Sequence, residues 1–481
     1  MPTRKKKIII VGNGMATCRL LDELCTRKAL DRFDVTVFGD EQSGAYNRIM
    51  LGKVLESGDP DVIVTKPKSW YEERGIQLIS GTRVERLDPA ARRVYTTAGD
   101  AHHYDISVLA TGSQPLVPPI NGMNGEDGEL RAGVFVYRTV SDSMKIRAFS
   151  RAGDNAVVLG GGLLGLEAAK VLSDRGLHVT IVHLAHGLMN TQLDFVGGEM
   201  LRRQIEQAGL FVRTGRTIES IVGEADVEGV VLDDGERLAA DVVVVACGVR
   251  PRVDVARASK IPINKGILVN DTLATQVPGV YAVGECIEHA GMTYGLVAPA
   301  WEQAEVLADV LSGANPQARY RGSKLYARLK VAGVEVASLG TIEPVLDTDE
   351  VIQVVEERKN AYRKIITRDR KLIGAQMVGN TQAAAALIQL FDRGDPMPAD
   401  PLEGLCSFAA GGLGAAVGAR MVCNCHKVSE EALVQAIVDG ACSVEELCSQ
   451  TRAGTGCGSC RSDLSQLVQL HAKKATLAVS A

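Results

Sequence analysis

Short apolar runs recur along the chain, and two of them, at residues 7–11 and 155–159, are each followed by a glycine turn and a helical pattern. The run at residues 7–11 precedes Gly12 and a helical pattern that continues to about Leu24, and a second apolar strand covers residues 34–38. The same order returns at residues 155–182. Apolar runs without polar alternation suit parallel strands that are buried on both faces. The pattern therefore predicts two βαβ units, each with glycines between its first strand and its helix.

The two glycine turns have the spacing of dinucleotide-binding motifs. The second reads G-x-G-x-x-G in full, whereas the first has Thr17 at the third position, where its branched side chain is expected to loosen the packing of helix on strand slightly. Glycines let the backbone approach a pyrophosphate, the helix N-terminus offers free N–H groups, and an acid after the second strand binds ribose hydroxyls. The residues expected to hold two dinucleotides are Gly12, Gly14, Met15, Ala16, Asp40 and Glu41 in the first unit and Gly160, Gly162, Gly165 and Glu167 in the second.

His183 stands at the end of the second strand of the second unit, without an acid beside it. An acid at this position favours NAD, whereas an arginine nearby favours NADP. His183 is therefore a candidate contact to the second dinucleotide, and the choice between NADH and NADPH stays open.

Composition and charge exclude several classes of function. The 481 residues are 46% hydrophobic and 23% charged, which is ordinary for globular domains, and at roughly 150 residues per domain they predict about three domains. The net charge is 53 − 58 = −5 with scattered basic residues, so no nucleic-acid surface is indicated. Because no stretch of about 18 apolar residues is present and Gly12 interrupts the first run, a cytoplasmic protein without a membrane partner is expected.

Four of the 11 cysteines form two close pairs separated by 31 residues, and this is the pattern of a metal site. They are Cys423, Cys425, Cys457 and Cys460. The residues between the pairs predict a helix over 428–438 and a second helix after a capping box at 443–446, so both pairs can meet at one end. Zinc is the alternative for any four-cysteine site, but the glycines at 454, 456 and 458 favour a [2Fe–2S] cluster, because backbone N–H groups can then approach its sulfides.

Three further apolar strands, at residues 108–113, 242–251 and 280–286, end in turns of small residues. Together with the glycine motifs they resemble the flavoprotein family that has two dinucleotide-binding domains, over about the first 310 residues. The resemblance implies FAD on the first unit, NAD(P)H on the second, and a return of the chain to the FAD domain. It also implies FAD contacts by Arg48, Lys53, Val84, Thr111, Gly112, Arg138 and Glu285, with a solvated surface charge as the alternative for Arg48.

The remaining cysteines lack the arrangement that thiol chemistry needs. Disulfide reductases of this superfamily carry a C-x4-C pair on the helix after the first glycine motif, whereas Cys18 and Cys25 are seven residues apart here. Their spacing puts them on one face of the helix, as core residues. We therefore expect inert, small hydrophobic side chains at Cys18, Cys25, Cys247, Cys286, Cys406, Cys442 and Cys448.

The expected fold class is α/β, with two dinucleotide-binding (Rossmann-like) domains, a small α+β interface domain and a C-terminal helical [2Fe–2S] domain. Alternating strands and an Ala-rich helix indicate the α+β domain, and the prolines and glycines after it indicate a linker. The expected ranges are 1–118 and 250–312 for the FAD-binding domain, 119–249 for the NAD(P)H-binding domain, 320–398 for the interface domain, 399–419 for the linker and 420–472 for the [2Fe–2S] domain.

The order of these modules predicts a line of electron transfer. Nicotinamide gives two electrons as a hydride, flavin accepts two and releases them singly, and an iron–sulfur cluster carries one. The cysteine segment resembles the bacterioferritin-associated-ferredoxin-like [2Fe–2S] domain. The segments at 11–15, 36–41, 160–167, 182–184 and 294–299 resemble the amino-terminal half of NAD(P)H-dependent assimilatory nitrite reductase. No counterpart of that enzyme's sirohaem domain precedes Ala481, so nitrite chemistry on this polypeptide is not expected.

The resemblance extends to the electron-transfer subunits of assimilatory nitrate reductases, which pass electrons to a separate molybdenum-containing catalytic subunit. Such a redox partner, with NADH or NADPH as the electron donor, is the leading hypothesis. A reductase component for a separately encoded nitrite reductase or for an oxygenase is the alternative. A regulatory role, with the last domain as a sensor or docking module, is a third hypothesis.

Overall fold

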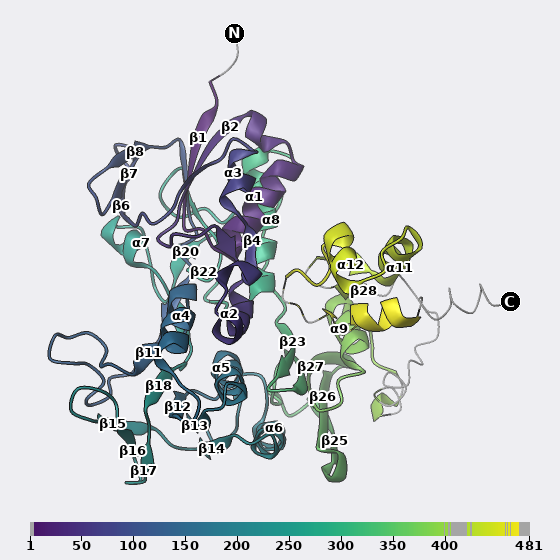
Figure 1. The fold of residues 1–481 in the computed structure, drawn as a ribbon. Helices are drawn as coiled ribbons and strands as arrows, with labels where there is room; N and C mark the ends of the chain where they lie inside the picture. Colours follow the sequence, from purple (N-terminus) through teal and green to yellow (C-terminus); the bar gives the residue numbers. More distant parts are fainter. Residues whose placement is uncertain are drawn as a thin grey trace. The chain divides into compact units, whose positions relative to one another are not determined.

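The computed structural model divides into two units (Figure 1). The first comprises residues 1–152 and 244–323, and the second comprises residues 153–243 and 324–481. The structure describes residues 4–398, 400–402, 405, 421–423, 426–456, 458, 460, 461 and 463–470. Most of the predicted linker therefore lies outside the described residues.

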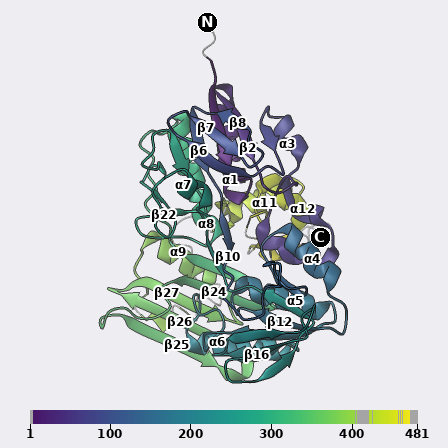
Figure 2. The same ribbon diagram turned by 90° about the vertical axis from the view of Figure 1, so that its left-hand side faces the viewer.

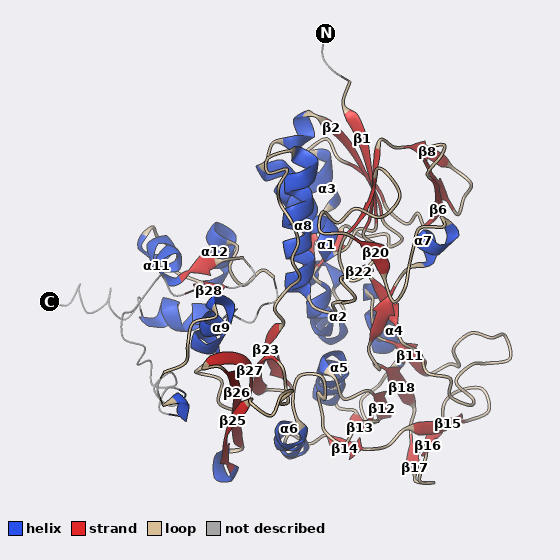
Figure 3. Cartoon of the chain, turned by 180° about the vertical axis from the view of Figure 1, so that it is seen from behind, coloured by secondary structure: helices blue, strands red, loops and turns tan. Residues whose placement is uncertain are grey.

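A parallel five-stranded sheet forms the core of the first unit, with the strand order β21-β9-β1-β2-β5. Its strands are β1 (Lys6–Val11), β2 (Phe33–Phe38), β5 (Gln77–Ile79), β9 (Ile106–Leu109) and β21 (Val280–Ala282). The predicted apolar run in β1 is buried from Ile8 to Val11, as expected for a central parallel strand. Helices α1 (Met15–Thr26) and α8 (Val297–Ser312) lie side by side against this sheet (Figure 3), so the chain returns to the first unit after residue 243.

The other elements of the first unit are short. The helical ones are η1 (Ala29–Asp31), η2 (Arg48–Met50), α2 (Leu51–Ser57), η3 (Pro60–Ile63), α3 (Lys68–Glu72), α4 (Val140–Phe149) and α7 (Asp254–Ala258). The strands are β3 (Ala45–Tyr46), β4 (Val64–Lys66), β6 (Val84–Asp88), β7 (Arg93–Thr96), β8 (Ala101–His103), β10 (Ser113–Pro115), β11 (Val134–Val136), β19 (Val249–Pro251), β20 (Ile267–Val269) and β22 (Ile287–His289). The antiparallel pairing of β10 with β19 brings the turn after β9 next to residues that follow position 248.

The second βαβ pattern opens the second unit. β12 (Asn155–Leu159), α5 (Leu163–Asp174) and β13 (His178–His183) follow in the predicted order, and β12 pairs in parallel with β13. β13 also pairs in parallel with β14, and β18 is the other neighbour of β12. The further elements of this part are α6 (Phe195–Gln207), β14 (Phe211–Thr214), β15 (Ile218–Val222), β16 (Gly229–Leu232), β17 (Arg237–Ala239) and β18 (Val242–Val245). Both βαβ units are thus present as predicted.

An antiparallel five-stranded sheet follows, with the order β23-β24-β27-β26-β25 (Figure 2). Its elements are β23 (Tyr326–Val331), β24 (Val334–Gly340), β25 (Glu350–Glu356), η4 (Glu357–Lys359), β26 (Ala361–Arg368), β27 (Lys371–Val378) and helix α9 (Ala384–Arg393). Successive side chains of a strand point to opposite faces. In β26, Ile365 joins the apolar cluster under α9, whereas Tyr362 and Lys364 contact Asp194 at the start of α6. The sheet is therefore covered by α9 on one face and by α6 on the other.

Among its described residues, the C-terminal module contains a short antiparallel ladder, two helices before residue 452, and further helical residues at 463–470. The ladder pairs β28 (Met421–Cys423) with β29 (Val428–Ser429), and the helices are α11 (Glu430–Val438) and α12 (Val444–Thr451). Ser429 caps α11, and Ser443 forms the predicted capping box with Glu446, with both reciprocal hydrogen bonds present. None of the described helices in the chain is long and apolar enough to cross a membrane.

Candidate functional site

The first glycine turn leaves the N-terminus of α1 open to an anion. Gly12 has a φ of +110°, and a Cβ on it would lie 2.2 Å from the carbonyl oxygen of Ala110. Gly14 is the N-cap of α1, gives its N–H groups no side-chain cap, and has open space where a Cβ would stand. Unpaired N–H groups at a helix N-terminus bind phosphate. This cradle fits the pyrophosphate of a dinucleotide, with Met15 and Ala16 in the first turn.

Thr17 corrects one expectation about this motif. Its side chain is fully buried, and its hydroxyl donates a 2.7 Å hydrogen bond to the carbonyl oxygen of Gly12. The branched residue therefore ties α1 to the glycine turn instead of loosening it. A threonine can replace the small residue because its hydroxyl has a partner within the motif.

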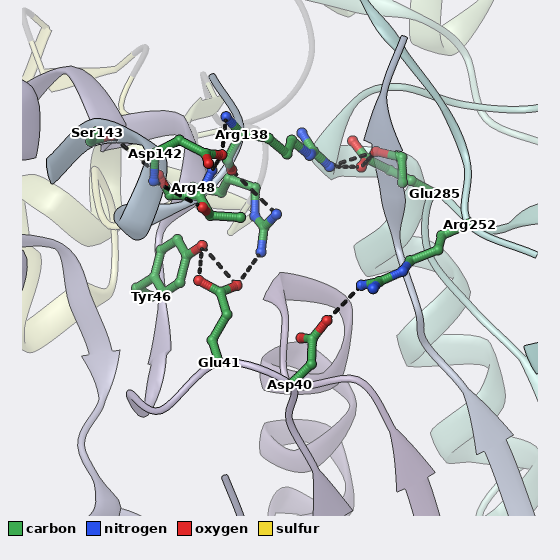
Figure 4. A network of polar contacts seen from close by, with 11 residues as sticks. Asp40, Glu41, Tyr46, Arg48, Arg138, Asp142, Ser143, Arg252 and Glu285 are labelled. Atoms are coloured by element: carbon green, nitrogen blue, oxygen red, sulfur yellow. Dashed lines mark hydrogen bonds and ion pairs between the residues drawn. The ribbon is translucent and has the colours of Figure 1, made fainter. Parts of the chain in front are cut away.

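The two acids that follow β2 enter different ion pairs (Figure 4). Asp40 accepts a 2.6 Å hydrogen bond from Arg252, which belongs to the returning segment. Glu41 accepts hydrogen bonds from the Tyr46 hydroxyl at 2.9 and 3.0 Å and from Arg48 at 3.0 Å. Arg48 is therefore held within a polar network, which disfavours the alternative that it is a solvated surface charge.

The same network continues to the predicted ribityl acid (Figure 4). Arg48 donates to the carbonyl oxygen of Arg138, and the Arg138 guanidinium contacts Glu285 and the Ser113 hydroxyl. Burial lowers the pKa of Arg138, and the carboxylate of Glu285 opposes this effect. The Arg138 Nε atom is buried without a hydrogen-bond partner in the described chain. Since buried donors are rarely left unpaired, this atom indicates a missing acceptor, as a bound flavin nucleotide provides.

Four other predicted FAD contacts occupy varied places. The Thr111 hydroxyl donates to the carbonyl oxygen of Arg252 at 2.6 Å, and the backbone N–H of Arg252 donates to the carbonyl oxygen of Gly112 at 2.9 Å. Val84 is buried at the start of β6, and Lys53 is exposed on α2, so neither joins the network of Figure 4. Arg252 itself is a participant that the sequence interpretation missed, because 212 positions separate it from Asp40.

The second glycine turn forms a hydrogen bond with His183. Gly160 has a φ of +125°, and Gly162 is the N-cap of α5 with open space where a Cβ would stand. The Gly161 N–H donates to His183 Nδ1 at 3.1 Å, and His183 Nε2 lies 3.2 Å from Asn190 Oδ1. Burial lowers the pKa of His183. A neutral imidazole that accepts at Nδ1 and donates from Nε2 satisfies both contacts.

The four predicted cluster ligands are only partly within the described chain. Cys423 at the end of β28 and Cys460 are both buried in the apolar cluster of the C-terminal module, while Cys425 and Cys457 lie outside the described residues. Among the residues that are described, no three His, Cys, Asp or Glu side chains gather in a way that could hold a metal ion. Gly454 and Gly458 have positive φ values of 75° and 74°, as expected for a tight loop beside the second cysteine pair. This donor set fits a [2Fe–2S] cluster.

Comparison with protein families agrees with this geometry. Residues 6–304 match the pyridine nucleotide-disulphide oxidoreductase family. The chain belongs to that family. Two further matches follow, to the rubredoxin NAD+ reductase C-terminal domain over residues 326–394 and to the BFD-like [2Fe–2S] binding domain over residues 421–469. The predicted fold class and the predicted cofactors, FAD, NAD(P)H and a [2Fe–2S] cluster, are thereby confirmed.

Individual relatives of this pyridine nucleotide oxidoreductase carry names from nitrogen metabolism. It is 38% identical to a nitrite reductase [NAD(P)H] and 34% identical to an assimilatory nitrate reductase electron transfer subunit, both from Bacillus subtilis, over 97% and 95% of this chain. The chain spans only 58% and 59% of those two relatives. A solved ferredoxin reductase from Rhodopseudomonas palustris is 26% identical, with a TM-score of 0.70 over 78% of this chain and 91% of that one.

Four cysteines outside the predicted cluster site have thiols whose ionisation is disfavoured by burial. Burial raises the pKa of Cys18 and of Cys247 to about 11, and it also raises the pKa of Cys25 and Cys286, so these thiols stay protonated at neutral pH. The expectation of a packed, apolar position is wrong for Cys442, which is exposed because it precedes the Ser443 cap at the start of α12. Cys406 lies outside the described residues.

Replacing His183 with glutamate is expected to shift cofactor preference toward NADH by about tenfold in the ratio of kcat/KM values. A carboxylate at the end of β13 can accept the ribose hydroxyls and repels a 2′-phosphate, and it can also accept the Gly161 N–H. Steady-state kinetics with both cofactors measure the ratio. His178→Glu, at the exposed start of the same strand, is the matched control. An unchanged ratio in His183→Glu contradicts the placement of His183 beside the adenosine ribose.

Glu167 on α5 gives a pH-dependent prediction. Desolvation raises its carboxyl pKa from 4.5 to about 7. The folded protein then binds this proton more tightly than the unfolded chain, so the free energy of unfolding falls as pH rises from about 4.5 through about 7, by on the order of 2 kcal/mol. Glu167→Gln removes this loss. Urea unfolding at pH 5 and pH 8 measures it, with Glu219→Gln, an exposed position on β15, as the control; equal pH slopes for wild type and Glu167→Gln refute the assignment.

Proposed function

We propose that this protein takes a hydride from NAD(P)H and delivers the electrons one at a time to a separate acceptor protein. The observation that carries the proposal is the union in one chain of the pyridine nucleotide oxidoreductase match over residues 6–304 and the [2Fe–2S] match over residues 421–469. When bound, FAD accepts the two electrons of a hydride and releases them singly to the cluster. Two one-electron transfers to the acceptor therefore balance each NAD(P)H.

Distinct parts of the chain hold the three groups in this proposal. FAD belongs to residues 1–118 and 250–312, NAD(P)H to 119–249 and the cluster to 420–472, with 320–398 as the interface domain and 399–419 as the linker. The FAD contacts are Gly12, Gly14, Met15, Ala16, Asp40, Glu41, Arg48, Lys53, Val84, Thr111, Gly112, Arg138 and Glu285. Gly160, Gly162, Gly165, Glu167 and His183 contact NAD(P)H, and Cys423, Cys425, Cys457 and Cys460 bind the cluster.

The chain's own side chains bind and orient, and they need no acid–base pair. The N-termini of α1 and α5 supply N–H groups for two pyrophosphates, because glycine N-caps leave those groups unpaired by side chains. Arg138, fixed by Glu285 and Ser113, keeps its buried Nε–H as a donor toward the flavin nucleotide. Holding the donor and acceptor rings in contact is the main contribution that a protein makes to hydride transfer.

Nitrate reduction is the proposed destination of the electrons, through a molybdenum-containing catalytic subunit. The similarity to an assimilatory nitrate reductase electron transfer subunit, 34% identical over 95% of this chain, supports it. Nitrite reduction is the second candidate, because the identity to a nitrite reductase [NAD(P)H] is 38% over 97% of this chain. The share of each relative that the chain spans is nearly equal, so coverage does not separate the two.

The acceptor is tested by isolating the tagged protein with its native partner and following NADH-dependent consumption of nitrate and nitrite in parallel. Nitrate loss that disappears when the molybdenum-containing partner is removed supports the proposal. Nitrite loss alone moves the protein to a nitrite reductase system. Consumption of neither contradicts both nitrogen assignments while leaving the NADH-dependent reduction of an artificial one-electron acceptor as a test of the reductase itself.

A further inference from the structure

Among the described residues, the C-terminal module contacts the antiparallel-sheet domain of the second unit at α9 and at strand β23. In the described chain its buried apolar residues, from Val422 to Leu467, form a cluster of their own, separate from the cluster beneath α9. β28 lies against α9, as Figure 1 shows, and the side of the module that carries Asp463 reaches strand β23. Among these residues, no continuous apolar core joins the C-terminal module to the sheet. A polar contact between the two therefore matters more for holding the module in place.

That polar contact is a two-pronged ion pair. Arg328 Nη1 lies 2.5 Å from Asp463 Oδ2, and Nη2 lies 3.2 Å from Asp463 Oδ1. The two side chains are only 20% and 15% exposed. A bidentate arginine–carboxylate pair fixes direction as well as distance, and partial burial protects it from screening by salt. Asp463 is three residues after Cys460, so the pair acts within one helical turn of a cluster ligand.

The strand that carries Arg328 belongs to a sheet that buried polar contacts link to α6. β23 is the edge strand next to β24. On β26, Lys364 pairs with Asp194 at 2.8 Å, each side chain being 5% exposed, and Tyr362 donates to the same carboxylate at 2.5 Å. These buried, hydrogen-bonded contacts join the sheet to α6, and removing one partner would leave an uncompensated charge. The module is thus joined by an oriented contact to a sheet that is itself packed on α6.

We propose that the Arg328–Asp463 ion pair is a positioning contact that seats the [2Fe–2S] module on the edge of the sheet for electron transfer within the chain. The proposal rests on the proposed function as far as electron transfer is concerned, whereas the seating of the module is independent of it. Neither residue touches the reacting groups. They act by restricting the module to one orientation, and loss of either leaves a partly buried charge without its partner.

Arg328→Ala tests the contact, with Arg368→Ala as the matched control. Arg368 lies in the same sheet and makes an equally bidentate pair, with Asp349, that does not involve the module. Stopped-flow mixing with NADH separates flavin reduction from the later reduction of the cluster. We expect an unchanged flavin phase and an about tenfold slower cluster phase in Arg328→Ala, which corresponds to about 1.4 kcal/mol. Arg328→Lys keeps the charge but not the fork, and an intermediate rate is expected.

Hydrogen exchange of residues 463–470 in the as-isolated protein measures the seating without electron transfer. We expect faster exchange in Arg328→Ala and in Asp463→Ala, wild-type exchange in Arg368→Ala, and recovery in the swapped Arg328→Asp/Asp463→Arg protein, all with wild-type iron content. Unchanged exchange in Arg328→Ala overturns the seating. Faster exchange with an unchanged cluster phase overturns the positioning role. A wild-type cluster that NADH does not reduce refutes the proposed function instead, and the exchange result then decides the seating alone.

Discussion

Cys423→Ser is expected to yield a protein that binds FAD, is reduced by NADH at the wild-type rate, and contains almost no cluster iron or sulfide. Cys423 is fully buried at the end of β28, within the module's own apolar cluster. A serine oxygen is a poor substitute for a thiolate that binds iron. Since the proposed FAD contacts Arg48, Arg138 and Glu285 lie in the other unit, we expect flavin binding to be independent of the module. Iron and sulfide analysis measures the loss of the cluster, and flavin bleaching at 450 nm measures the binding and reduction of FAD.

The matched control for this substitution is Cys442→Ser. Cys442 is in the same module, but it is exposed, and its N–H group takes part in the cap of α12 through Glu446. Serine keeps that N–H group, so wild-type iron content and wild-type reduction of a one-electron acceptor are expected. Full iron content in Cys423→Ser refutes the ligand assignment. Loss of FAD from it contradicts the independence of the two halves.

Local features of the fold could be predicted from the sequence because short-range chemistry determines them. The apolar run at 8–11 is buried in β1, the strand at 155–159 is recovered residue by residue, and the Ser443 capping box has both of its hydrogen bonds. Each of these elements is specified by neighbours within a few positions. The glycine N-caps of α1 and α5 belong to the same class, and the candidate site could therefore be placed at two helix N-termini.

Contacts between distant segments could not be predicted in this way. The pair of Asp40 with Arg252 joins residues 212 positions apart, and the pair of Lys364 with Asp194 joins residues 170 positions apart. Neither arginine nor lysine carries a local signal that names its partner, since pairing depends on how sheets and helices pack. Thr17 shows the reverse case: the motif comparison marked it as a poor fit, whereas its hydroxyl completes the glycine turn through a bond that the spacing does not reveal.

Gly12→Ala is expected to lower FAD occupancy by at least about tenfold. Gly12 needs a φ of +110°, a sparsely populated region that costs an alanine about 1–3 kcal/mol, and the added Cβ would lie 2.2 Å from the carbonyl oxygen of Ala110. That oxygen belongs to backbone that continues β9 and cannot give way, so the turn must open and withdraw N–H groups of α1 from the pyrophosphate. The FAD absorbance relative to protein in the purified variant, and its recovery on adding excess FAD, measure the loss.

Gly128→Ala separates the close approach from the backbone strain. Gly128 also has a positive φ, of +82°, but a Cβ there meets nothing within 4 Å, and the residue is exposed in the same unit. We expect Gly128→Ala to keep wild-type FAD occupancy with a small loss of stability. Equal FAD loss in both variants means that backbone strain at any position of the unit has this effect, and it contradicts a specific role for the glycine turn at Gly12. Full FAD occupancy in Gly12→Ala contradicts the placement of the pyrophosphate at the N-terminus of α1. The physical basis for placing FAD in the first unit is then lost as well.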